Sequence, residues 1–247
     1  MITKTKGVVL KEFRFRETSK ILTLYTLKYG KIQAMARGAY RPKSQLIANT
    51  QTFSYNEYQL YKGKNFYYIN QGDIIDSFYS IRENIDRLMY GSYLLELMDL
   101  STMEEEQNEK LFFLLLKGLS VLSKLDRGFV RFILAYELKF ISFLGYKPLL
   151  DRCANCGNKD LNVIKFSIEK GGIICKDCFR QDNFCENMDS NMYKAMKSLL
   201  YTPLDEIMCL KIPECIMFKL HAIMEKYILN KIDREKFNSL MMLKSMK

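Results

Sequence analysis

Histidine, tryptophan and proline are scarce in this sequence, and each shortage narrows what the chain can be. Its 247 residues include one His, no Trp, four Pro and 12 Gly, so it is neither collagen-like nor a low-complexity polymer. The single histidine, His221, sits between Leu220 and Ile223 on a predicted apolar helix face, where packing is its ordinary role. No second histidine is present to activate a Ser or Cys nucleophile.

Long apolar runs and nucleotide-binding motifs are also missing. The run Leu111–Leu116 stops at Lys117, far short of the 18 or more residues of a membrane-spanning helix. The first residues, MITKTKGVVLKEF, do not resemble a secretory signal. No G-x-x-x-x-G-K-[ST] loop for ATP and no H-x-E deaminase motif occur. We therefore expect no membrane partner and no enzyme activity, although catalysis by carboxylates alone stays open.

Positive charge is abundant and unevenly placed. The net charge is +10, and residues 1–80 hold 13 Lys and Arg against 5 Asp and Glu, so this third of the chain alone carries +8. The same residues hold 14 of the 32 Phe and Tyr. Basic side chains neutralise phosphates and aromatic faces stack on bases, so the pattern favours a nucleic-acid-binding N-terminal domain. A charge for solubility and aromatics that fill a barrel core are the alternatives.

The length and the change of pattern at about residue 80 predict two domains, 1–80 and 81–247, in an α+β chain. Residues 4–80 contain five β-rich segments joined by turns at Tyr29-Gly30 and Lys62-Gly63-Lys64. This arrangement is typical of a five-stranded OB-fold barrel, with a β-sandwich as the alternative. Residues 81–247 show helical periodicity. Phe129 to Leu144 form the expected central helix, and the acidic stretch MEEEQNEK at 103–110 is interpreted as a loop or helix start.

Seven cysteines, an odd number, argue against a disulfide framework and for reduced thiols in a cytosol. Four of them form two C-x-x-C pairs separated by 18 residues: Cys153, Cys156, Cys175 and Cys178. Two such knuckles can close a tetrahedron of thiolates around one structural Zn²⁺ per chain, within about residues 150–180. An iron–sulfur cluster and four unpaired thiols are the alternatives. Cys185 is a possible substitute ligand, and Cys209 and Cys215 are predicted to be core residues.

Seven basic residues of the N-terminal domain are the DNA-binding candidates: Arg14, Arg16, Lys20, Lys31, Arg37, Arg41 and Lys43. Three of them belong to the stretch ARGAYRPKS, where Gly38 and Pro42 predict a loop. A loop of this kind projects its charges into solvent, so a grip on the phosphate backbone is expected there. Among the aromatics, Phe53, Tyr55 and Tyr61 are expected on one strand face and Tyr58 on the other.

The ordered set of segments RETSKILTLYTLKYGKI, ARGAYRPKSQL, FISFLGYKPLLDRCANCG and KFSIEKGGIICKDC spans the chain. It resembles the bacterial RecO family of recombination mediators. The resemblance implies an N-terminal OB fold and a helical C-terminal domain with a zinc-binding insert, whose four ligand positions match the four cysteines. The family's basic loop has a positive residue where this chain has Tyr40, so that contact is not carried over.

The resemblance also implies a function in DNA repair. RecO-like proteins bind single- and double-stranded DNA, anneal complementary strands and, with RecR, help to place RecA on DNA coated by single-strand-binding protein. This implies a cytoplasmic protein at the bacterial nucleoid. The helical domain of such proteins meets the acidic C-terminal tail of single-strand-binding protein, and the weak candidates for that contact here are Arg127, Arg131 and Lys139.

Two other functions remain open from the sequence. One is a zinc-containing OB-fold protein that binds structured RNA, which a preference for RNA over single-stranded DNA would reveal. The other is a carboxylate-dependent nuclease, which would cleave labelled DNA in the presence of Mg²⁺ or Mn²⁺.

Overall fold

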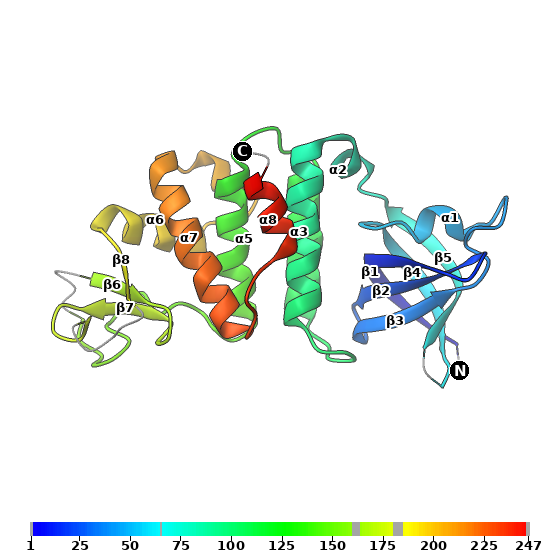
Figure 1. Cartoon of the computed structure of the whole chain (residues 1–247), viewed down its shortest axis with the longest axis horizontal. Coiled ribbons are helices and arrows are strands. Elements are labelled where there is room, and N and C mark those ends of the chain that lie inside the picture. The colour runs from blue at the N-terminus through cyan, green and yellow to red at the C-terminus, as the bar shows by residue number, and fades with distance from the viewer. Residues whose placement is uncertain (1, 65, 160–163, 180–184, 246–247) are drawn as a thin grey trace. The chain divides into compact units, whose positions relative to one another are not determined.

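The computed structural model describes residues 2–64, 66–159, 164–179 and 185–245. Its chain divides into two compact units, one of residues 1–124 with 237–247 and the other of residues 125–236. The first unit begins with a β-barrel and continues into helices, and the second is helical with a small sheet (Figure 1). The α+β organisation expected from the sequence is confirmed.

Five strands close the barrel in the order β1-β2-β3-β5-β4. They are β1 (Ile2–Phe15), β2 (Ser19–Thr26), β3 (Gly30–Ala36), β4 (Tyr55–Lys62) and β5 (Tyr67–Asp76). The long strand β1 pairs with β4 from Ile2 to Val8 and with β2 from Gly7 to Phe15, and the pairing with β2 has a register shift between Val9 and Lys11. A parallel pairing of β3 with β5 completes the closure. The OB-type barrel is therefore confirmed, and the sandwich alternative is wrong.

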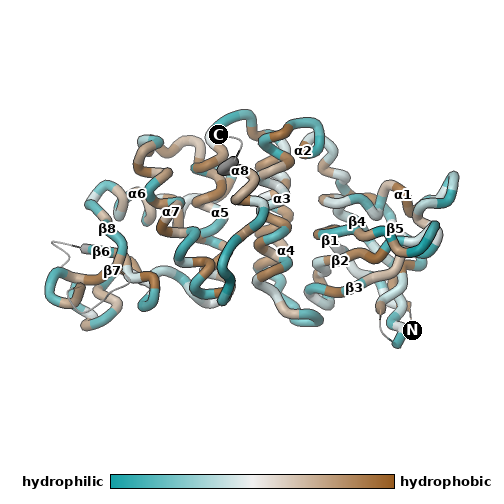
Figure 2. The backbone as a smooth tube through the Cα atoms, in the orientation of Figure 1, coloured by the Kyte–Doolittle hydropathy of each residue, from teal (hydrophilic) through white to brown (hydrophobic). Residues whose placement is uncertain are grey.

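Alternation along the strands places one set of side chains in the barrel core. Leu22 and Leu24 of β2 and Ile32 and Ala34 of β3 are buried together there. The connection from β3 to β4 carries the short helix α1 (Leu46–Asn49). Figure 2 shows that this connection and the tip of the β1–β2 hairpin are largely hydrophilic, whereas hydrophobic residues follow the strands. The polar side chains of these two connections therefore lie at the surface of the barrel.

Four helices complete the first unit: α2 (Tyr79–Glu83), α3 (Ile85–Ser101), α4 (Glu109–Leu122) and α8 (Asn238–Ser245). Asn84 and Asn108 cap α3 and α4 by accepting bonds from the backbone N–H groups of Arg87 and Leu111. The carboxylate of Glu96 on α3 accepts the backbone N–H groups of Asn238 and Ser239 at 3.0 and 2.9 Å. These two hydrogen bonds hold the start of α8 against α3.

The second unit is built on α5 (Phe129–Phe143), with α6 (Ser190–Tyr201), the short 3₁₀ helix η2 (Ile207–Cys209) and α7 (Glu214–Lys231). Nine residues of α5 are buried, as the nearly continuous apolar pattern predicts for a central helix. Strands β6 (Ile164–Ser167), β7 (Gly172–Cys175) and β8 (Cys185–Asn187) form a sheet in the order β7-β6-β8. Across the described residues, no helix is long and apolar enough to cross a membrane.

Candidate nucleic-acid interface and metal centre

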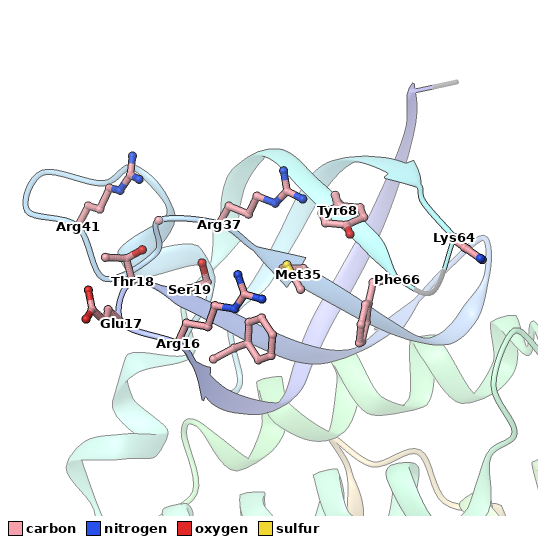
Figure 3. A pocket seen from close by; sticks show the side chains of 12 residues that line it. Arg16, Glu17, Thr18, Ser19, Met35, Arg37, Arg41, Lys64, Phe66 and Tyr68 are labelled. Atoms are coloured by element: carbon pink, nitrogen blue, oxygen red, sulfur yellow. The ribbon is translucent and has the colours of Figure 1, made fainter.

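A groove of about 980 Å³ lies on the barrel surface, between the loops that connect its strands. Met35 of β3 and Tyr68 of β5 alternate with core residues, so they belong to the strand face that points away from the barrel core. They lie on the wall of this groove together with residues from three connections (Figure 3). Its complete lining is Phe15, Arg16, Glu17, Thr18, Ser19, Met35, Arg37, Gly38, Arg41, Lys64, Phe66 and Tyr68.

Four cations and three aromatic rings share this groove. The Arg37 guanidinium lies 4.6 Å from the Tyr68 ring centre, and that of Arg16 lies 5.3 Å from the Phe15 ring centre. Figure 3 shows Arg16, Arg37 and Tyr68 near one another, with Arg41 at one end and Lys64 at the other. Cations that neutralise phosphates beside aromatic faces that stack bases make a suitable surface for a single strand.

Backbone contacts fix the loops that carry the cations. The Tyr40 N–H donates to the Thr18 carbonyl at 2.9 Å, which ties the loop of residues 37–45 to the β1–β2 turn. The Tyr40 ring is contacted by two cations, with Arg14 at 5.5 Å and the Lys20 ammonium at 4.9 Å from its centre. Arg41 and Arg16 are therefore held on two connected loops.

The seven predicted DNA-binding residues take different positions. Arg16, Arg37 and Arg41 line the groove, while Lys43 and Arg14 are exposed nearby without lining it. The side chain of Lys20 is buried and forms an ion pair with Glu12. Lys31 donates to the Asp99 carbonyl at 2.5 Å and lies 3.5 Å from its carboxylate. Lys20 and Lys31 are thus already engaged within the fold.

Sequence reasoning missed most of the groove lining, including Lys64 and the three aromatic residues Phe15, Phe66 and Tyr68. Of the aromatic residues named instead, Phe53 and Tyr58 are buried. Tyr61 does not line the groove, but its ring stacks on that of Tyr68, which does, with 4.9 Å between the ring centres. The basic hairpin Lys62-Gly63-Lys64 followed by aromatic residues was the available signal. The turn between the fourth and fifth strands of an OB fold flanks the binding face, so a basic turn there belongs to the site.

The second unit contains a group of four cysteines suited to a metal ion. The Sγ atoms of Cys153, Cys156, Cys175 and Cys178 lie within 4.8 Å of one another, and those of Cys156 and Cys175 are 3.7 Å apart. A tetrahedral site with Zn–S bonds of about 2.3 Å has sulfur–sulfur edges of about 3.8 Å. The sulfur separations are therefore close to those of a four-thiolate metal site.

Each C-x-x-C pair folds into a tight knuckle. The Gly157 N–H donates to the Cys153 carbonyl at 2.9 Å, and the Cys178 N–H donates to the Cys175 carbonyl at 3.1 Å. Gly157 has φ +73° and no atom within 4 Å of where a Cβ would sit, so backbone conformation, not space, requires glycine there. A turn ending at Gly171 leads into β7, which ends at Cys175, the first cysteine of the second pair.

Backbone N–H groups near the four cysteines favour the thiolate form of one of them, Cys153. Burial raises the pKa of Cys153, but backbone N–H groups of Cys156, Cys175 and Asn155 outweigh it and lower that pKa to about 6. The Asn158 backbone lowers the pKa of Cys156, yet the sulfurs of Cys153 and Cys178 outweigh this and raise it to about 12. Sulfurs this close repel a second negative charge, and a bound divalent cation removes that repulsion.

The remaining cysteines lie outside this group. Cys185 begins strand β8 and is not one of the four clustered sulfurs. The prediction that Cys209 and Cys215 are core residues is wrong, because both are exposed. Cys209 ends η2 and Cys215 lies in the first turn of α7. Their apolar sequence neighbours supply the buried positions of these elements instead.

The three predicted partner-binding cations of the second unit also differ from one another. Arg127 is exposed. Arg131 donates to the carbonyls of Met208 and Ile212 at 3.1 and 3.5 Å. Lys139 donates to the last carbonyls of α6, those of Leu199 and Leu200, at 2.8 and 3.1 Å, and burial lowers its pKa to about 8. Two of the three therefore satisfy backbone groups inside the unit.

Comparison with known families covers nearly all of the chain. The sequence model described as Recombination protein O N terminal matches residues 1–78, and that described as Recombination protein O C terminal matches residues 82–241. The chain belongs to the RecO family. The predicted resemblance is confirmed over both parts of the chain. The N-terminal RecO match coincides with the barrel that carries the groove, and the C-terminal match includes the cysteine group.

Curated relatives in the RecO family agree in length and name. "DNA repair protein RecO" of Alkaliphilus metalliredigens is 38% identical over 240 residues, which are 97% of this chain and 98% of the relative. "DNA repair protein RecO" of Caldicellulosiruptor saccharolyticus is 35% identical over 228 residues, 91% of each chain. That of Acetivibrio thermocellus is 31% identical over 231 residues, 94% of this chain and 92% of the relative.

Proposed function

We propose that this RecO-family chain acts in DNA repair by recombination and binds single- and double-stranded DNA through its N-terminal domain, residues 1–80. The groove carries this proposal, because it gathers Arg16, Arg37, Arg41 and Lys64 around partly exposed aromatic rings. Its cations contact phosphates of any sequence, and its rings stack on bases of any kind. Arg14 and Lys43 add positive charge at the margin.

The mediator role of the family defines the rest of the proposal. Bound strands are annealed to complementary strands, and the chain, with RecR, helps to load RecA onto DNA coated by single-strand-binding protein. The mediator itself catalyses no reaction and acts in the bacterial cytoplasm at the nucleoid. The helical part of the chain, which we take as residues 81–247, receives the acidic tail of single-strand-binding protein, with the exposed Arg127 of the second unit as the accessible cation among the three candidates.

We propose that the four cysteines hold one structural Zn²⁺ per chain. Four protein ligands complete a tetrahedral shell and leave no position for substrate. The ion would join two knuckles that are 18 residues apart in sequence and stabilise the segment between α5 and α6. An iron–sulfur cluster is the alternative occupant, and visible absorption of the purified protein separates the two.

The experiment that tests the function is annealing of complementary oligonucleotides coated with the cognate single-strand-binding protein. The chain is expected to accelerate duplex formation, and the variant Arg37→Ala/Arg41→Ala is expected to lose most of that acceleration while remaining folded. No acceleration by the wild-type chain would contradict the mediator role. Preference for structured RNA in competition would favour the RNA-binding alternative, and DNA cleavage with Mg²⁺ or Mn²⁺ would favour the nuclease.

A further inference from the structure

An acidic loop lies against the barrel beside the groove. It comprises residues 103–107, between α3 and α4, and contains Glu104, Glu105 and Glu106. The Glu105 N–H donates to the Lys31 carbonyl of β3 at 2.8 Å. A Cβ at Gly30 would lie 1.9 Å from the Glu106 carbonyl oxygen, so the loop backbone packs where only glycine fits. The loop is therefore docked on the start of β3.

The docked loop places the carboxylate of Glu105 next to the Lys62 ammonium of the barrel. The Lys62 ammonium lies 2.6 and 2.8 Å from the two carboxylate oxygens of Glu105 and 5.3 Å from the Tyr67 ring centre. Glu105 has φ +57°, a backbone conformation that non-glycine residues adopt at a cost. Its backbone bond to β3 and its ion pair with Lys62 hold it there. Lys62 consequently presents a neutralised charge.

The ion pair lines a second hollow that adjoins the groove. A smaller cavity of about 270 Å³ is lined by Lys62, Lys64 and Phe66 on one side and by Glu104 and Glu105 on another. Lys64 and Phe66 also line the large groove, so the two hollows meet at the β4–β5 turn. A strand that passes Lys64 towards Lys62 would bring its next phosphate up to two carboxylates. The negative phosphate and the negative carboxylates would repel each other. In addition, the Glu105 carboxylate already occupies the position that a phosphate would take beside the Lys62 ammonium.

We propose that Glu105 is a specificity-determining residue that sets the end of the nucleic-acid path at Lys64. Without it, Lys62 would become one more phosphate contact and the bound strand would extend past the β4–β5 turn. This inference rests on the proposed function, because it assumes that the groove binds DNA. The inference adds a limit on the number of nucleotides that the groove can bind, which the positive charge of the barrel alone would not impose.

The test compares salt dependence of binding for Glu105→Gln and wild-type full-length protein, with a labelled oligothymidylate of about 30 nucleotides. One added phosphate contact steepens the slope of log K against log salt by about 0.7 and raises affinity about three- to fivefold near 0.1 M salt. Lys62→Ala alone should change affinity less than about twofold. In the double variant Glu105→Gln/Lys62→Ala, the gain should disappear, because Lys62 supplies it. The number of nucleotides occluded per chain should rise only in Glu105→Gln.

Glu83→Gln is the matched control, because it removes one exposed carboxylate of the same unit on α2, away from this loop. An equal gain in Glu83→Gln would show a general charge effect and overturn the inference. Loss of affinity in Lys62→Ala equal to that in Lys64→Ala would also overturn it, because Lys62 would already contact DNA. If Arg37→Ala/Arg41→Ala leaves binding unchanged, the proposed groove itself fails. If that variant weakens binding and Glu105→Gln equals wild type, only the limit set by Glu105 fails.

Discussion

The barrel and the second unit use the same polar residue types in opposite ways. In the barrel, Arg16, Arg37 and Arg41 project from loops into an open groove, and the core beneath them is apolar. In the second unit, Arg131 and Lys139 bond backbone carbonyls, and four cysteines gather around a common point. These groove cations are therefore separable from the folding of the barrel, whereas Arg131, Lys139 and the four cysteines are part of the structure of the second unit.

Replacing one clustered cysteine tests this contrast most severely. Cys175→Ser should lose the proposed zinc ion and disorder residues 150–180, because metal binding free energy in such small modules is folding free energy. Elemental analysis should fall from about one zinc per chain to near zero, and hydrogen exchange should accelerate in that segment alone. The barrel should keep its exchange protection and its binding to DNA.

Cys185→Ser is the control for that variant, because Cys185 is not among the four clustered sulfurs. It should retain the zinc and the exchange protection. Full zinc content in Cys175→Ser, or loss of the barrel's DNA binding with it, would break the contrast between the two units.

Removing the groove cations should do the reverse, with loss of binding and no loss of fold. In Arg37→Ala/Arg41→Ala/Lys64→Ala the slope of log K against log salt should become shallower by about 2, at about 0.7 for each phosphate contact. Affinity should fall about equally for homopolymers and mixed sequences, because phosphate contacts carry no base information. Exposed substitutions of this kind change stability by within about 0.5 kcal/mol each.

Lys43→Ala is the control for this variant, because Lys43 lies in the same loop as Arg41 but does not line the groove. Its effect on the slope should be the smallest of the four positions. A triple variant with wild-type slope would remove the groove from the binding surface.

The partly buried Lys139 predicts that the stability of the second unit depends on pH. Burial lowers its pKa from 10.5 to about 8 in the folded chain, so between those two values the unfolded state binds the extra proton. The stability of the wild type should therefore rise with pH through this window relative to Lys139→Met, by at most about 1.4 kcal/mol per pH unit. Below pH 8 the difference between the two proteins should be constant. Denaturant unfolding of both proteins at several pH values measures it.

Lys197→Met, on the exposed face of α6, is the control for loss of a lysine and should show no such relative rise. A flat difference between Lys139→Met and wild type across pH 8 to 10.5 would contradict a lowered pKa of Lys139 in the folded chain.

The smallest expected effect concerns Tyr40, which connects the two loops of the groove. Cation–π contacts with Arg14 and Lys20 are worth about 0.5–1 kcal/mol at exposed sites. Tyr40→Ala should therefore destabilise the barrel by about that amount and weaken DNA binding about two- to threefold. Tyr40→Phe keeps the ring and should match the wild type in both assays. Equal loss in both variants would assign the effect to the hydroxyl.

Local patterns predicted most elements of the fold. Alternating apolar residues placed the strands, and the spacing of Phe132, Tyr136 and Phe140 placed the central helix of the second unit. The C-x-x-C spacing predicted the cysteine group because a knuckle is made within four residues. Cys209 and Cys215 were misjudged, because apolar neighbours in sequence do not determine which side of a short helix faces the core.

Sequence alone determined the OB-type barrel, the cysteine group and the basic character of the first 80 residues, because each depends on local periodicity, fixed spacing or composition. Only the tertiary structure decided which charges face solvent. Lys20 and Lys31 meet Glu12 and Asp99, while Lys64 from a distant hairpin joins Arg37 in one groove. An ion pair or a groove depends on which side chains the closed barrel brings within a few ångströms, and strand closure joins residues that are far apart along the chain.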